Sequence, residues 1–203
     1  LAPDTIRGVS ITFDDGMLSV LTNAMPILRE HGAPAHLFIT TGALESGQQW
    51  PEQPSDVPGF DMLDWNQVEK LQQSGIHIDA HTVTHPDMRK LSSERMIEEC
   101  EVANDEIERR TGRRPEFFAY PFGYHNLKAR EVCRNIYRAS VTTELRKLSS
   151  HEDMAALPRL DTYYLQSPWL TDGIDRPLSA VYLRVRWLLR TLRRTHCTAN
   201  YND

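Results

Sequence analysis

The sequence predicts an α/β fold in which parallel strands alternate with helices. Short apolar segments and segments of helical periodicity follow one another along most of the 203 residues, and this alternation is typical of repeated βα units. Polar side chains suited to catalysis come directly after several of the expected strands, where the active sites of parallel α/β proteins lie. A chain of this length can form one domain with a sizeable core, so we expect residues 1–203 to be a single domain.

The composition argues against several functional classes. Hydrophobic residues make up 40% of the chain and charged residues 25%, with a net charge of −5, so the overall charge gives no indication of nucleic-acid binding. No apolar segment approaches the ~18 residues that a membrane span needs. The three cysteines are widely separated and form no CxxC pair, which argues against a cysteine zinc site. Cys100 is expected to be a small buried residue of a helix.

Three strands and two helices are expected in the first part of the chain. The first helix carries leucine and methionine side chains at helical spacing, and Pro26 interrupts or kinks it. Asp64 and Gln67 form a variant of the capping box at the start of the second helix. The loop over residues 42–63 is long enough to be functional or mobile. The expected strands are residues 9–13, 35–40 and 76–80, and the helices end at Gly32 and Gly75.

The second part of the chain continues the alternation. Leu91-Ser92-Ser93-Glu94 is typical of a helix start and Gly112 of a helix end. The remaining expected elements are strands over residues 117–120, 138–143 and 157–165 and a short helix over residues 127–134.

Two adjacent carboxylates follow the first expected strand, in Thr12-Phe13-Asp14-Asp15-Gly16. Neighbouring ionised carboxylates repel each other, and a bound cation removes that conflict by holding one of them as a ligand. Asp and Gly also favour turns. The pair alone therefore does not distinguish a metal site from a turn.

A histidine pair supplies the missing ligands, in His81-Thr82-Val83-Thr84-His85 after the third expected strand. One carboxylate and two imidazoles form a three-ligand site with an open coordination position, as in catalytic zinc sites. The second carboxylate is then free to act as a base on a bound water. Pro86 disfavours a helix at His85, so we expect a turn there. The two motifs together predict metal-assisted hydrolysis.

These motifs and Pro121-Phe122-Gly123 resemble the first three motifs of the polysaccharide deacetylases, the NodB-homology group or carbohydrate esterase family 4. The resemblance covers roughly residues 8–165. It implies a distorted (β/α) barrel of about seven strands and a divalent metal, commonly zinc, although cobalt, nickel or iron also suits such ligands.

The resemblance also assigns roles to individual residues. By position, Asp15, His81 and His85 bind the metal, and Asp14 is the general base. The backbone N–H of Phe122 helps to hold the oxyanion. Thr82 lies where the family's hydroxyl residue supports the histidine loop.

The chain departs from the family pattern at two places. Many relatives carry an Arg that pairs with the catalytic Asp, where this chain has Ala119. Arg159, in Leu157-Pro158-Arg159-Leu160-Asp161, is the candidate to orient Asp14 instead, and a purely structural ion pair is the alternative. The late Leu-x-Leu-x-His motif is not visible, which leaves the general acid unassigned.

Aromatic residues are candidates for sugar contacts. The segment Phe118-Ala119-Tyr120-Pro121-Phe122-Gly123 resembles most closely the branch that acts on poly-N-acetylglucosamine and related exopolysaccharides. Tyr120, Tyr163 and Trp169 are expected to contact the sugar rings of a substrate, and packing in the core or at its rim is the alternative.

The segment 176–194 is expected to form a basic amphipathic helix. It contains six arginines and no acidic residue, so it suits an anionic membrane surface or a partner. Packing on the barrel with a solvated basic face is the alternative.

The expected function is metal-dependent removal of N-acetyl groups from N-acetylglucosamine-containing polysaccharide (exopolysaccharide, chitin-like glycan or peptidoglycan). The expected location is secreted, periplasmic or at the cell envelope, since a leader before Leu1 is compatible with the sequence. The alternatives are an O-acetyl esterase or other amidohydrolase on the same fold, and a catalytically silent glycan-binding domain.

Overall fold

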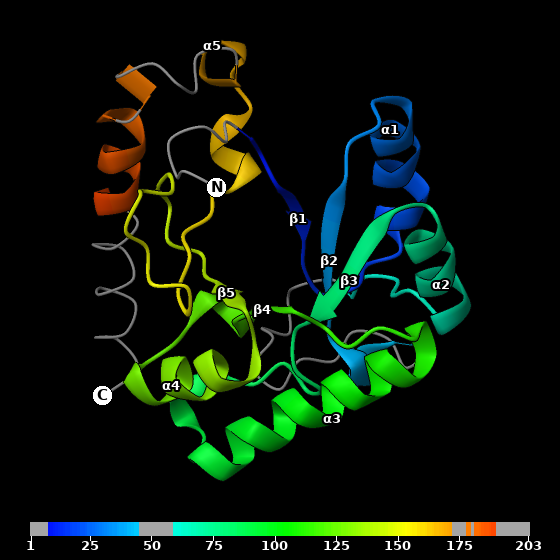
Figure 1. Ribbon diagram of the computed structural model, residues 1–203. Coiled ribbons are helices and arrows are strands. Elements are labelled where there is room, and N and C mark those ends of the chain that lie inside the picture. Colours follow the sequence, from blue (N-terminus) through cyan, green and yellow to red (C-terminus); the bar gives the residue numbers. More distant parts are fainter. Residues whose placement is uncertain (1–7, 45–58, 172–177, 180, 190–203) are drawn as a thin grey trace.

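The computed structural model describes residues 8–44, 59–171, 178–179 and 181–189. Its centre is a curled sheet in which every pair of neighbouring strands is parallel (Figure 1). The strands lie in chain order, which is the order of an opened (β/α) barrel. They are β1 (Ile11–Phe13), β2 (Ala35–Ile39), β3 (Ile76–Ala80), β4 (Phe117–Ala119) and β5 (Ala139–Val141). The α/β class with parallel strands is confirmed.

The described residues contain five strands, where the family resemblance implied about seven. The expected strand over residues 157–165 is wrong. Leu157 makes a single parallel bridge to Val141 beside β5, and Thr162–Leu165 forms the 3₁₀-helix η5. Asp161 explains the change, because its side chain accepts a hydrogen bond from the N–H of Tyr163 and begins a helical turn.

Helices cover the outside of the sheet, and their ends agree with the expected capping signals. Asp64 and Gln67 make both bonds of the capping box, of 2.8 and 2.9 Å. Gly112 adopts the left-handed conformation (φ 72°) that ends the third helix. The helices are α1 (Met25–Glu30), α2 (Trp65–Gln73), α3 (Ser93–Thr111), α4 (Leu127–Ile136) and α5 (Pro168–Thr171).

The first expected helix is divided, as Pro26 predicts. A π-helical segment, Val20–Ala24, runs directly into α1. Pro26 lies in the first turn of α1, where its missing N–H is least costly because the first N–H groups of an α-helix have no intrahelical partner.

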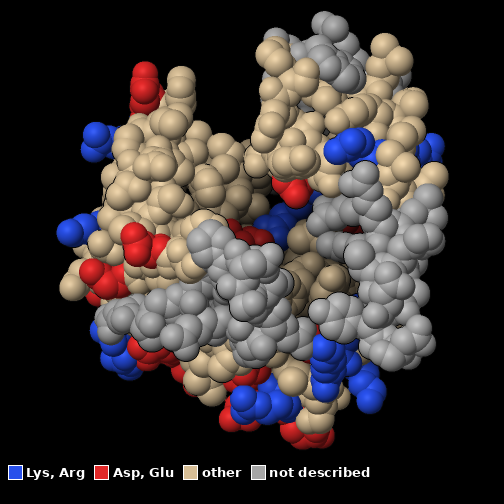
Figure 2. All heavy atoms as spheres, turned by 180° about the vertical axis from the view of Figure 1, so that it is seen from behind, with Lys and Arg blue, Asp and Glu red and all other residues tan. Residues whose placement is uncertain are grey.

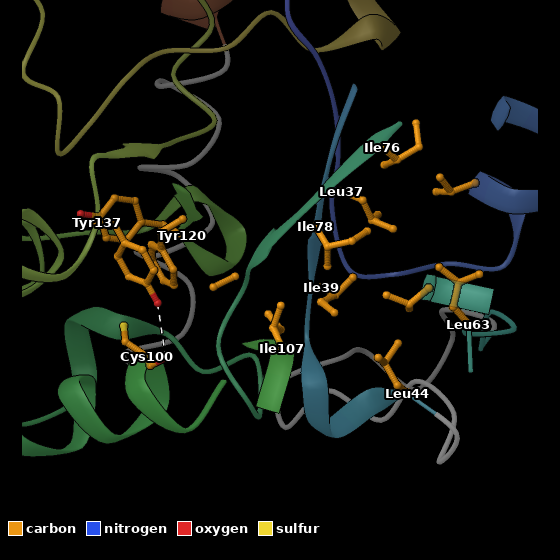
Figure 3. Close-up of a cluster of buried hydrophobic side chains, with 14 of the residues drawn as sticks. Leu37, Ile39, Leu44, Leu63, Ile76, Ile78, Cys100, Ile107, Tyr120 and Tyr137 are labelled. Atoms are coloured by element: carbon orange, nitrogen blue, oxygen red, sulfur yellow. Dashed lines mark hydrogen bonds between the residues drawn. The ribbon is translucent and has the colours of Figure 1, made fainter. Parts of the chain in front are cut away.

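One face of the sheet packs in the hydrophobic core, and the other carries the site residues. Leu37 and Ile39 of β2 pair with Ile78 and Ala80 of β3, and all four are buried under the helices (Figure 3). Because side chains alternate along a strand, the intervening residues of β2 and β3 face the other side. His81 continues that alternation at the end of β3, so the fold directs it to the concave side of the sheet.

Two sequence expectations concern buried side chains. Cys100 is fully buried on α3 as expected, and lies in the same core cluster as Cys133 of α4. Tyr120 is also fully buried, and its hydroxyl donates a 2.8 Å hydrogen bond to the carbonyl of Ala155. The expected sugar contact of Tyr120 is therefore wrong, because its ring packs edge-on against Phe118 in the core. Figure 3 shows Tyr120 and Tyr137 in this core cluster.

The C-terminal helical segment is described at residues 178–179 and 181–189, and the rest of the expected helix over 176–194 lies outside the described residues. Ser179 and Leu183 are buried, which fixes the side that contacts the domain. The opposite side is apolar and exposed, at Leu178, Val181, Val185, Leu188 and Leu189. None of the described helices has the length and apolar character required to span a membrane.

Replacing Tyr120 by Phe removes the donor to the Ala155 carbonyl. We expect the free energy of unfolding to fall by about 1–2 kcal/mol, the usual cost of a lost buried hydrogen bond, as measured by urea unfolding. Tyr163→Phe is the control, because Tyr163 is 65% exposed. Equal stability of the two variants would contradict the core role of the Tyr120 hydroxyl.

Candidate active site

The carboxyl ends of β1 and β3 bring together one carboxylate and two imidazoles. The Nε2 atoms of His81 and His85 lie 3.3 and 3.5 Å from Oδ1 of Asp15. One ligand atom from each residue lies within 4.8 Å of the others, and no other such group of three occurs among the described residues. These donors suit zinc and similar divalent metals.

The orientation of His81 fits a metal ligand. Its Nδ1 lies 2.7 Å from the carbonyl oxygen of Ala119, which can only accept, so the ring proton is on Nδ1. Nε2 is the nitrogen that faces Asp15. A ligand histidine usually donates its second nitrogen to a carbonyl or carboxylate in this way, which fixes both tautomer and ring orientation.

The chain between the histidines is a turn, as Pro86 predicts, and it has unusual backbone geometry. Thr82 and His85 have positive φ angles of 68° and 57°, which non-glycine residues rarely adopt. The hydroxyl of Thr82 accepts a 3.0 Å hydrogen bond from the N–H of His85. Burial and the charge of His81 lower the pKa of His85 to about 4, so His85 is neutral at physiological pH, the form that binds a metal.

Asp14 turns away from Asp15 and forms a two-pronged ion pair with Arg159. Nη1 and Nη2 of Arg159 lie 2.7 and 2.6 Å from the two carboxylate oxygens. Burial acts to raise the pKa of Asp14, but the hydrogen bonds and charge of Arg159 outweigh it, so the pKa lies below its ordinary value. Asp14 is therefore ionised at neutral pH, as a general base must be.

Arg159 is itself held in place by two further contacts. Its Nε donates to the carbonyl of Thr142 at 2.9 Å, and Nη1 donates to the hydroxyl of Thr12 at 3.2 Å. The guanidinium is therefore fixed between β1 and the segment after β5. The ion pair expected from the Leu-Pro-Arg segment is present, and Ala119 offers only its carbonyl to the site.

The turn Pro121–Gly123 brings Phe122 to the histidines. The ring of Phe122 packs edge-on against His85, with centroids 4.5 Å apart. Phe122 and Gly123 have positive φ angles of 58° and 70°, and a Cβ atom on Gly123 would lie 2.1 Å from Oγ1 of Thr143. This close approach requires glycine at that position. The Thr143 hydroxyl also donates to the Phe122 carbonyl at 3.3 Å, so the peptide groups of the turn are held.

The other expected site residues have varied surroundings. Tyr163 lies on η5, mostly exposed, with its ring edge-on to Tyr164. Trp169 belongs to α5, but its side chain lies outside the described residues. His125 packs against the buried ring of Tyr120, and among the described residues no histidine is identified as the general acid.

The face seen from behind is hollowed near its centre, and acidic and basic side chains lie inside the hollow beside largely uncharged surfaces (Figure 2). Asp14 and Asp15 are partly exposed, at 29% and 20% of their side-chain surfaces, so both can be reached from solvent.

Comparison with known proteins identifies the family. The family model for polysaccharide deacetylase matches residues 2–138. The chain belongs to the polysaccharide deacetylase family. This family consists of hydrolases.

Individual relatives agree with this assignment. The Bacillus subtilis (strain 168) protein YxkH is 27% identical over 155 residues, which are 75% of this chain and 50% of YxkH. The chain therefore spans half the length of that relative. The Streptococcus pyogenes deacetylase PplD, solved with acetate, is 27% identical with a TM-score of 0.64, over 73% of this chain and 62% of PplD.

A second solved structure supports the fold alone. IcaB from Ammonifex degensii matches with a TM-score of 0.66 and 23% identity, over 86% of this chain and 75% of IcaB. The curled parallel sheet is thus the deacetylase (β/α) barrel fold.

One buried acidic residue next to the site was missed by the sequence analysis. Glu99 of α3 accepts hydrogen bonds from the backbone between the two histidines. The only signal in the sequence was a charged residue in a helix on the same face as Met96, Ala103 and Ile107, which are all buried.

Proposed function

We propose that the protein is a metal-dependent deacetylase that removes N-acetyl groups from N-acetylglucosamine-containing polysaccharide. The observation that carries the proposal is the convergence of Asp15, His81 and His85 beside an ionised Asp14. Membership of the polysaccharide deacetylase family supports deacetylation as the reaction. The resemblance of the segment 118–123 to the exopolysaccharide branch supports an N-acetylglucosamine-containing polysaccharide as the substrate. The partly exposed Asp14 is compatible with a large substrate.

Asp15, His81 and His85 would hold the metal, which we propose to be zinc, with cobalt, nickel or iron as substitutes. A metal bound by these residues would supply Lewis-acid chemistry, which would polarise the amide carbonyl and lower the pKa of a bound water. Each imidazole contributes Nε2, and the Ala119 carbonyl maintains the ring of His81 in the required tautomer.

Asp14 acts as the general base in this proposal. It accepts the proton of the attacking water while that oxygen bonds to the acetyl carbon, and Arg159 keeps its carboxylate ionised and oriented. The backbone N–H of Phe122 donates to the oxyanion of the tetrahedral intermediate. When the C–N bond breaks, the amine takes up a proton, which Asp14 can return, and acetate leaves.

The first test is acetate release from N-acetylglucosamine oligomers by the purified protein, after chelation and after reloading with zinc or cobalt. We expect no release after chelation and recovery on reloading.

Asp14→Asn should lower kcat by about 100-fold or more, the usual contribution of a general base, while zinc binding is retained. A fully active Asp14→Asn variant would contradict this mechanism.

The same assay separates the alternatives. Release from matched O-acetyl substrates alone would indicate an esterase on the same site. Glycan binding without acetate release under any metal would indicate a silent binding domain.

Arg159→Lys tests the orientation of the base. Lysine keeps the charge but cannot form the two-pronged pair, so we expect kcat/KM to fall by about 10- to 100-fold, the equivalent of one charge-assisted hydrogen bond. Zinc affinity should not change. Arg138→Lys is the control, because Arg138 is 73% exposed and pairs only loosely with Glu116 at 3.4 Å. Equal activity of both variants would show that the pair of Arg159 is structural only.

We also propose that the C-terminal helical segment contacts an anionic membrane surface, which would place the enzyme at the cell envelope, in the periplasm or outside the cell. The exposed apolar side chains at residues 178–189 form one stripe, and Arg184 and Arg186 lie on either side of it by helical position. An apolar stripe flanked by basic residues is typical of interfacial helices.

Tyr163 and Trp169 are proposed as contacts for the sugar rings of the substrate.

Vesicle flotation tests the membrane contact. We expect the protein to float with phosphatidylglycerol-containing vesicles and not with neutral ones, and Val181→Ser with Leu188→Ser should reduce flotation. Leu127→Ser is the control, since Leu127 is equally apolar and 78% exposed but belongs to a different helix, α4. Equal flotation of the double variant and the unsubstituted protein would exclude the stripe as the contact.

A further inference from the structure

The loop that carries the two histidines, residues 81–85 (the histidine loop), is fixed on its carbonyl side by the segment after β2. The Thr40 hydroxyl donates to the carbonyl of His81 at 3.2 Å. The N–H groups of Thr41 and Gly42 donate to the carbonyls of Thr82 and Val83, at 3.2 and 2.9 Å. The carbonyls of the first three loop residues are thus satisfied by one neighbouring segment.

On the N–H side, a single carboxylate from α3 holds the middle of the loop. The side chain of Glu99 is 3% exposed. Oε2 accepts from the N–H groups of Val83 and Thr84, at 3.0 and 2.9 Å. Oε1 accepts from the Thr84 hydroxyl at 2.8 Å and from Arg95 at 3.1 Å. Both oxygens of this buried group are therefore occupied.

The loop needs such an anchor because its backbone is strained. Thr82 and His85 occupy the left-handed region, and non-glycine residues remain in this unfavourable conformation only where their surroundings hold them there. The two residues that Glu99 holds lie between these strained positions. Loss of the anchor would allow the loop to relax, and relaxation would change the distance between the imidazoles of His81 and His85.

We propose that Glu99 is a positioning residue that sets the separation and direction of the two histidine ligands through the backbone of Val83 and Thr84. The inference rests on the proposed metal-dependent function. It assigns to a helix residue outside the three motifs a role in metal affinity. A carboxylate is suited to this role because one oxygen can accept two adjacent N–H groups, and its charge strengthens both bonds.

The test is titration of the full purified chain with Co²⁺, whose visible spectrum reports the geometry of its ligands. Glu99→Ala should raise the Kd for Co²⁺ by about 10- to 100-fold, as for other residues that orient ligands, and should change the spectrum. Glu99→Gln keeps one acceptor oxygen and should have a smaller effect. Glu98→Ala is the matched control, because the adjacent Glu98 also pairs with Arg95 but is 57% exposed.

The outcomes separate a positioning role from a structural one. A Glu99→Ala variant with a lower melting temperature in its metal-free form but an unchanged Kd and spectrum would overturn the proposal. Should Glu99→Ala fail to fold, an unchanged Kd and spectrum in Glu99→Gln would overturn it equally. If the unsubstituted protein does not bind Co²⁺, the proposed function itself fails, and the inference fails with it.

Discussion

The site depends on two adjacent carboxylates that have different partners. Asp14 pairs with Arg159, whereas Asp15 adopts a positive φ of 74° and lies beside the two histidines. Aspartate tolerates this conformation better than most residues. This divergence gives each carboxylate its own surroundings, and the proposed division into a base and a metal ligand rests on it.

The sheet supplies the remaining constraint, because the strands place their carboxyl ends along one edge. His81 follows β3, while Ala119 at the end of β4 accepts its Nδ1 proton. The carbonyl of a neighbouring strand thus determines which nitrogen of His81 faces Asp15. The orientation of His81 therefore depends on the register of β3 and β4, in which Ala80 lies opposite Phe118. A slip of one residue would reverse the side-chain directions.

The sequence was most informative where local chemistry determines structure. The caps at Asp64 and Ser92 and the turn before Pro86 depend on neighbouring residues, and these expectations were correct. The burial of Tyr120 and the role of Glu99 depend on contacts between distant segments, which no local pattern contains. The segment 157–165 is a third case. Its apolar residues favour a strand, but the side chain of Asp161 accepts a hydrogen bond from the N–H of Tyr163 and the chain forms a 3₁₀-helix there.

The ion pair to Asp14 is present although the arginine expected at position 119 is absent, because Arg159 supplies the guanidinium. At the position before the Pro-x-Gly turn, where the family resemblance led us to expect an arginine, this chain has Ala119. The guanidinium that pairs with Asp14 comes from Arg159, beyond the residues that match the family model. The carboxylate of Asp14 requires only that a fixed, planar donor reach both of its oxygens. Thr142 and Thr12 satisfy that requirement by holding Arg159 from two sides. The constraint is thus on the position of the guanidinium in space, and a distant segment can meet it.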